Sequence, residues 1–128
     1  MNDTNSEFFY AGGSDLASRV SARDLRGQVE QAVMQGKRAV IELSNVISMS
    51  ESYADELFAV LVAHYGLEWF ANNIQLRHQS PHAPHVLLSI ATAIRRRLEN
   101  QDSHEVKATI DGLIAAKKYA NAHPVHPQ

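Results

Sequence analysis

The segment that most constrains the fold is residues 40–58, VIELSNVISMSESYADELF. It begins with β-branched and apolar residues typical of a central strand and then passes through a serine-rich turn. Either Ser50 or Ser52 is suited to cap a following helix, and Asp55 stands at the capping-box distance from Ser52. Carboxylates are favoured in a first helical turn by the helix dipole. The segment therefore predicts a strand, a turn and a helix.

The helix expected over residues 52–65 is apolar on most of its sides. Its predicted inward stripe consists of Leu57, Phe58, Leu61, Val62 and Tyr65. Ala59, Val60 and Ala63 make the remaining face apolar as well. A helix of this kind is buried or is covered by another molecule. Because full burial is difficult to arrange in a chain of 128 residues, we expect these three residues to contact a partner or a second copy.

Strands and helices alternate along the rest of the chain. Strands are predicted at residues 7–11, 38–43 and 74–78, with the returning strand of a hairpin at 16–19. Besides residues 52–65, helices are predicted from a capping box at Ser21 to Gly36, from Pro84 through an apolar face ending at Leu98, and from a Ser103 cap over 105–120. That face consists of Leu87, Ile90, Ala91, Ile94 and Leu98. Residues 67–73 are predicted to be a connection rich in large aromatic residues.

This order predicts a small α/β layer structure, with helices covering mainly one face of a mixed sheet of about four strands. We expect a single domain over residues 1–121 and a disordered tail over residues 122–128, which contains two prolines.

Composition excludes several classes of function. Without cysteine, the chain can form no disulfide, thiolate nucleophile or cysteine-ligated metal site. The longest apolar run, residues 57–63, is far shorter than the roughly 20 residues of a membrane span, and the acidic N-terminus is unlike a signal peptide. We therefore expect a cytoplasmic protein. Its pI of 6.4 argues against nucleic-acid binding, and its net charge of −4 over residues 1–64 marks the acidic half as the candidate partner surface.

The serine-rich turn and the helix after it resemble a known family, the bacterial STAS-like domains called DUF4325. The matching residues are Ser50, Ser52, Tyr53, Ala54, Asp55, Glu56, Leu57 and Phe58. Upstream, Ser18 and Arg19, followed by Ala22 and Leu25, are similar to the helix entry of that family. The resemblance covers residues 12–98 and implies a STAS-like fold.

The resemblance also implies a function. STAS domains similar to anti-sigma factor antagonists carry a phosphorylatable serine at this turn, and a GHKL-type ATPase or kinase switches them. Alignment places Glu51 at that position, where its carboxylate resembles a phosphorylated state. Ser50 and Ser52 are then the candidate phosphoacceptors, and Glu51, Asp55 and Glu56 are candidate partner-binding residues. We expect a non-catalytic regulatory module that binds a GHKL-type partner or forms a homodimer.

Two other groups of residues are candidates for a binding site. Arg95, Arg96 and Arg97 form the only dense basic run, which is either a solvated helix C-terminus or a site for nucleic acid or nucleotide phosphate. The histidines at 78, 82 and 85 are close enough in sequence to suggest a metal site, but no nearby carboxylate completes it. No catalytic constellation is found, and we expect no enzyme activity, no cofactor and no metal.

Overall fold

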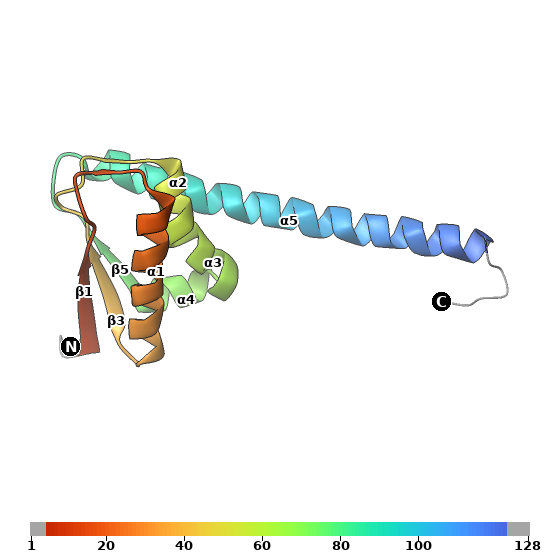
Figure 1. The fold of residues 1–128 in the computed structure, drawn as a ribbon, viewed down its shortest axis with the longest axis horizontal. Helices are drawn as coiled ribbons and strands as arrows, with labels where there is room; N and C mark the ends of the chain where they lie inside the picture. The colour runs from red at the N-terminus through yellow and green to blue at the C-terminus, as the bar shows by residue number, and fades with distance from the viewer. Residues whose placement is uncertain (1–4, 123–128) are drawn as a thin grey trace. The chain divides into compact units, whose positions relative to one another are not determined.

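A computed structural model describes the backbone of residues 5–122 (Figure 1). Side chains are described over residues 5–101 and at 110, 111, 113 and 114. The chain divides into two compact units, residues 1–97 and residues 98–128. Of the tail expected over residues 122–128, only Ala122 is described, as the end of a helix, and residues 123–128 lie outside the described part.

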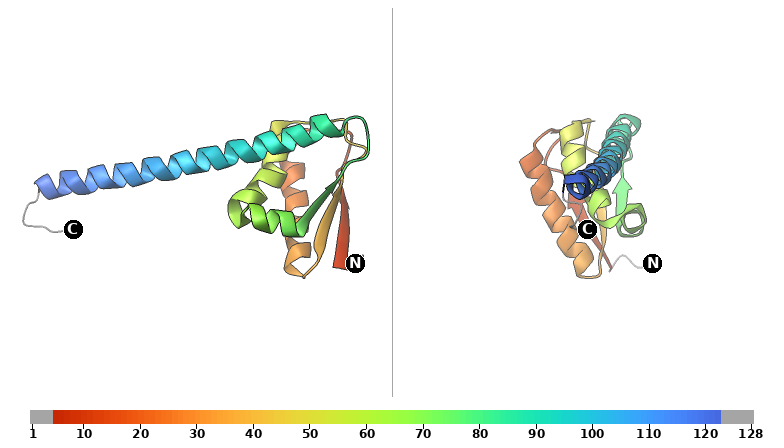
Figure 2. Two further views of the ribbon diagram at one scale, coloured as in Figure 1. Left: turned by 180° about the vertical axis from the view of Figure 1, so that it is seen from behind. Right: turned by 90° about the vertical axis from the view of Figure 1, so that its right-hand side faces the viewer.

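The main sheet of the described residues has three parallel strands, β1 (Ser6–Tyr10), β3 (Arg38–Glu42) and β5 (Ile74–Arg77). Their order is β1-β3-β5, so β3 is central. The three strands predicted at residues 7–11, 38–43 and 74–78 are confirmed, with small differences at their ends. Phe9, Ile41 and Leu76 lie opposite one another in register and point to the face that the helices cover. Figures 1 and 2 show helices α1 to α4 on one side of this sheet.

A second sheet corrects the expected hairpin and the expected mixed, four-stranded sheet. Strands β2 (Asp15–Leu16) and β4 (Ser48–Met49) pair in parallel with each other and not with the main sheet. The main-chain N–H groups of Ile47 and Ser48 both donate to the Ser14 carbonyl, so the chain after β1 runs beside the chain after β3 instead of turning back. The described residues therefore form parallel sheets of three and two strands.

Helix α1 (Arg19–Met34) begins two residues before the predicted start. Its cap is Ser18, which has extended backbone angles and accepts a hydrogen bond from the Ser21 N–H at 3.2 Å. The capping-box interpretation failed because two serines stand three residues apart, and the first of them is the cap. Gly36, with φ of 83°, follows the helix as predicted.

The next helical segment consists of α2 (Glu51–Ala54), the π-helical turn η2 (Asp55–Ala59) and α3 (Val60–Tyr65). Gly66 ends it with φ of 98°, again as predicted. The expected connection is instead a short helix, α4 (Leu67–Asn73). This helix was missed because Gly66 precedes it without a side-chain cap, so the sequence carries no start signal. Trp69 and Phe70 pack against the core, half-buried.

Helix α5 (Ala83–Ala122) runs continuously through the two helices that were expected to be separate, so Ser103 does not start a helix. The polar stretch at residues 99–104 interrupts the apolar pattern, but it contains no glycine or proline to end the helix. The buried stripe in the first unit is Val86, Ile90 and Ala93, whereas Leu87 and Ala91 of the predicted face are exposed. None of the described helices is both long enough and apolar enough to cross a membrane.

Candidate functional site

Three helices begin where the parallel strands end. Helix α1 follows β1 and β2, α2 follows β3 and β4, and α5 follows β5. In open α/β sheets the carboxyl edge of the strands is the usual place for binding sites. Here α2 is tied to α5 by an ion pair of Glu51, and the π-helical turn η2 that follows it is tied to α1 by an ion pair of Asp55, so this edge is the candidate site.

The first turn of α2 is fixed by its N-cap. Ser50 has extended backbone angles, and its hydroxyl accepts a hydrogen bond from the Tyr53 N–H at 3.1 Å. The Ser50 N–H donates to the Leu16 carbonyl at 2.8 Å, which attaches the turn to β2. Of the two capping candidates, Ser50 therefore caps the helix, while Ser52 is exposed in its first turn. The Tyr53 side chain is buried, and burial raises the pKa of its hydroxyl.

The carboxylates of this turn are all paired with arginines. Arg96 donates through Nη1 to both oxygens of Glu51, at 2.9 and 2.7 Å. Arg97 holds Asp55 with two parallel hydrogen bonds of 2.8 Å, and Arg19 adds a third at 3.2 Å. The bidentate Arg97 contact is the main cause that lowers the pKa of Asp55, against the opposing effect of burial.

Glu56 faces the other side, toward α1. Arg26 donates to its carboxylate at 2.7 Å, Arg19 donates at 3.1 Å, and Arg23 lies 3.7 Å away. The Arg26 hydrogen bond is the main cause that lowers the pKa of Glu56. Arg26 also donates to the main-chain carbonyl of Glu56, inside the π-helical turn where the regular α-helical bonding is interrupted.

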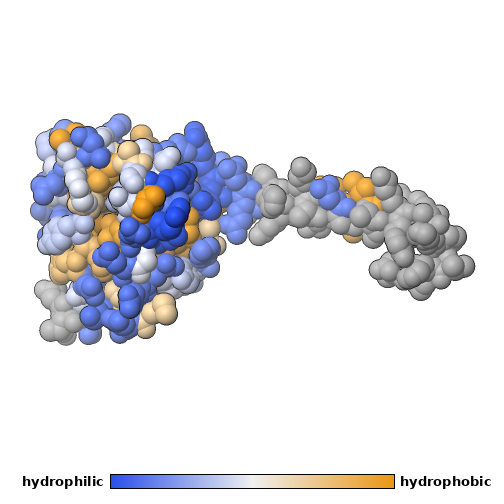
Figure 3. All heavy atoms as spheres, viewed as in Figure 1, coloured by the Kyte–Doolittle hydropathy of each residue, from blue (hydrophilic) through white to orange (hydrophobic). Residues whose placement is uncertain are grey.

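The arginines of α1 were missed as site residues. Arg19, Arg23 and Arg26 lie on one face of α1 because residues four and seven apart in a helix are neighbours. The spacing of these arginines was the signal in the sequence that could have identified them. The excess of acidic residues in the first half of the chain indicated which groups they would pair with. Figure 3 shows strongly hydrophilic side chains gathered over the beginning of α1.

The basic run on α5 is placed differently from the prediction. It was expected at a helix C-terminus, but α5 continues to Ala122, so no negative helix end lies there. Arg96 and Arg97 instead point to Glu51 and Asp55, and Arg95 is exposed. Two groups that sequence reasoning kept apart, the acidic turn and the basic run, are therefore brought together.

The chain itself covers the apolar face of the helical segment that was predicted over residues 52–65. Ala59 and Val60 are buried and Ala63 is half-buried. The expectation that these residues need a partner rested on the difficulty of burying them in a small domain. The structure removes that reason, because the described residues pack over Ala59 and Val60.

The three histidines do not converge. His78 contacts the Val46 carbonyl through Nε2 at 3.0 Å and the Ser80 hydroxyl through Nδ1 at 3.3 Å, while His82 and His85 are exposed. Among the residues that the structure describes, no group of three or more histidine, aspartate or glutamate side chains is placed to hold a metal ion.

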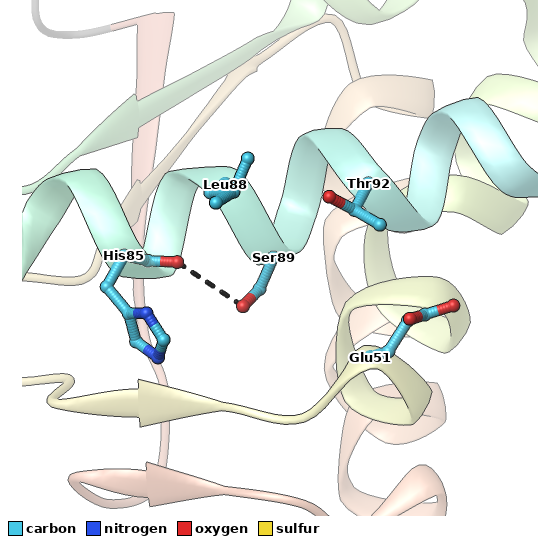
Figure 4. A pocket seen from close by; sticks show the side chains of 5 residues that line it. All are labelled: Glu51, His85, Leu88, Ser89 and Thr92. Atoms are coloured by element: carbon cyan, nitrogen blue, oxygen red, sulfur yellow. Dashed lines mark hydrogen bonds between the residues drawn. The ribbon is translucent and has the colours of Figure 1, made fainter.

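A shallow groove of about 170 Å³ lies beside the first turn of α2. It is lined by Glu51 and by four residues of α5, His85, Leu88, Ser89 and Thr92. Figure 4 shows Thr92 of α5 above Glu51, and the Ser89 hydroxyl donating to the His85 carbonyl at 3.3 Å. The groove extends the candidate site from α2 along α5.

The fold and the site define a small α/β domain that presents a serine-capped turn at the carboxyl edge of a parallel sheet. Residues 21–82 match the family model of a STAS-like domain of unknown function (DUF4325). The match confirms the resemblance found in the sequence, over a shorter range than residues 12–98. No curated protein and no solved structure matches the chain. Arg19, Arg96 and Arg97, which pair with the turn, lie outside the matched residues.

Proposed function

We propose that the chain is a non-catalytic protein-interaction module whose partner contacts the first turn of α2. The observation that carries this proposal is that Glu51 and Ser52 are exposed on a turn that is fixed on three sides. The Ser50 cap and the hydrogen bond to Leu16 hold its start, and the ion pairs hold its flanks toward α1 and α5. A preorganised surface loses little conformational freedom on binding, which favours association.

The resemblance to STAS domains supports a more specific role. In that role the partner is a GHKL-type ATPase or kinase, and the module acts by partner switching. Glu51, at the position of the usual phosphoacceptor, supplies a permanent charge at the helix start. Ser52 is then the phosphoacceptor of this chain, because its side chain is exposed whereas the Ser50 hydroxyl is engaged as the cap. A phosphate there adds about −1.5 to −2 charges.

Site-specific crosslinking tests the proposal. A photoreactive benzoylphenylalanine is placed at Ser52 of the full chain in its native host, and crosslinked products are identified by mass spectrometry. Gln35, exposed at the opposite end of α1, is the matched control position. We expect a distinct protein product at position 52 that is absent at position 35, with a GHKL-type ATPase as the predicted partner. A second copy of the chain would indicate a homodimer instead, and identical products at both positions would refute the proposal.

A further inference from the structure

Guanidinium groups make up most of the outer surface of the ion-pair network. The side chains of Arg19, Arg23 and Arg96 are 48%, 59% and 64% exposed, whereas those of Asp55 and Glu56 are 17% and 14% exposed. Asp55 and Glu56 therefore lie inward beneath the arginines, whereas Glu51, which pairs with Arg96, is 43% exposed. A turn that is acidic in sequence presents a basic rim in the folded chain, and we call Arg19, Arg23 and Arg96 the arginine rim.

We infer that the arginine rim and the adjoining groove bind an acidic protein segment that carries an apolar side chain. This inference rests on the proposed function and specifies the chemistry of the partner. An arginine has five N–H donors, and Arg19 donates to Asp55 and Glu56 only through Nη1. The Arg19 side chain is 48% exposed, so its other N–H donors can pair with a further carboxylate, and an incoming acid can join the network without displacing an existing one.

The groove supplies the apolar contact. Leu88 lines it and is 61% exposed. Thr92 lines it next along α5, and Arg96 follows four residues later on the same helical face. The α5 side of the groove therefore carries an exposed leucine, and an arginine of the rim lies one turn beyond Thr92. The eight residues from Leu88 to Arg96 rise about 12 Å along α5, so an extended segment with an apolar residue near Leu88 would place an acid three or four residues further along near Arg96.

The charge count favours a protein segment over a nucleic acid. Five arginines, Arg19, Arg23, Arg26, Arg96 and Arg97, meet the four carboxylates Glu30, Glu51, Asp55 and Glu56, which leaves a surplus of one positive charge. Duplex DNA carries about one negative charge per 1.7 Å, so many of its phosphates would face these carboxylates unpaired. A protein segment with a few acidic residues matches this small surplus of positive charge better than a nucleic acid does.

The test is a titration of the isotopically labelled full chain by NMR. The probe is a short peptide with glutamates and aspartates around one leucine. The controls are the same peptide with lysine in place of each acid and a single-stranded oligonucleotide of equal charge. The test variant is Arg23→Gln/Arg96→Gln, which removes two exposed rim charges. The matched variant is Lys37→Gln/Arg38→Gln, which removes two charges at the start of β3.

We expect the acidic peptide to shift the amide resonances of residues 51–55 and 85–96 and the lysine peptide to leave them unchanged. Affinity should fall roughly five- to tenfold in the rim variant, as expected for two exposed charge pairs, and should stay near wild type in the matched variant. No shift, an equal affinity loss in both variants, or tighter binding of the oligonucleotide would overturn the inference. If position 52 captures a protein whose contact segment is not acidic, the inference fails and the proposed function stands. If the acidic peptide binds but position 52 captures no protein, the proposed function fails.

Discussion

The pairing of Asp55 with Arg97 gives the most direct test of the ion-pair network. Replacement of Asp55 by asparagine keeps the shape of the side chain and removes its charge. The wild-type carboxylate accepts two hydrogen bonds of 2.8 Å from Arg97 and one of 3.2 Å from Arg19. Arg97 and Arg19 are both partly exposed, so solvent screens these contacts and reduces their contribution.

The expected loss in the free energy of unfolding is about 2 kcal/mol at neutral pH. A partly buried, bidentate hydrogen-bonded pair contributes about 1.5 kcal/mol, and the more exposed Arg19 contact contributes about 0.5 kcal/mol. Urea unfolding, followed by the fluorescence of the single tryptophan, Trp69, measures this quantity. Asp24→Asn, which changes an exposed acid of α1, is the matched control and should shift stability by less than about 0.5 kcal/mol.

The contribution of Asp55 to stability should depend on pH in a definite direction. The pKa of Asp55 is lowered in the folded chain, chiefly by Arg97. Its contribution to stability is therefore complete above the unfolded-state pKa of about 3.9 and is lost as pH falls through the lower, folded-state value. The stability gap between wild type and the Asp55→Asn variant should narrow below about pH 4. A gap smaller than about 0.5 kcal/mol at pH 7, or one that stays constant in acid, would show that Asp55 does not pair in the folded chain.

Three further outcomes follow from local geometry. Ser50→Ala should destabilise the chain by about 1 kcal/mol because it removes the cap, with exposed Ser52→Ala as a nearly neutral control in the same urea assay. Phosphopeptide mapping of the chain from its host should find phosphate at Ser52 and none at Ser50, and the reverse would contradict the assignment. Gly66→Ala should cost about 1–3 kcal/mol since φ is 98° there. Gly27→Ala, within α1 where a Cβ meets nothing within 4 Å, should instead stabilise by about 0.5–1 kcal/mol; equal effects at the two glycines would refute the backbone argument.

Local signals explain the elements that were predicted well. Residues 38–43 and 74–78 are short runs rich in apolar residues between turn residues, and the structure places β3 and β5 there. Gly36 and Gly66 marked helix ends because both adopt positive φ, which other residues rarely do. The elements that were missed lack such signals. Strand β2 has only two residues and exists because β4 lies beside it, and α4 begins without a cap.

The site was predicted only in part. Ser50, Glu51, Ser52, Asp55 and Glu56 were identified as a turn of interest from residues adjacent in sequence. The arginine partners of the three carboxylates are 30 to 45 residues away along the chain, on α1 and α5. No periodicity or capping pattern links residues at that separation. The prediction from sequence therefore assigned no arginine partners to the carboxylates.

The sequence by itself determined the order of most strands and helices, the serine-capped turn and the match to a STAS-like domain over residues 21–82, because each of these depends on neighbouring residues. Only the tertiary structure decided which way the charges of the site face. The parallel sheet brings the starts of α1, α2 and α5 to one edge, and there Asp55 and Glu56 turn inward while the longer arginine side chains reach over them. The sign of a protein surface depends on which charged groups remain exposed after folding, and composition does not contain that information.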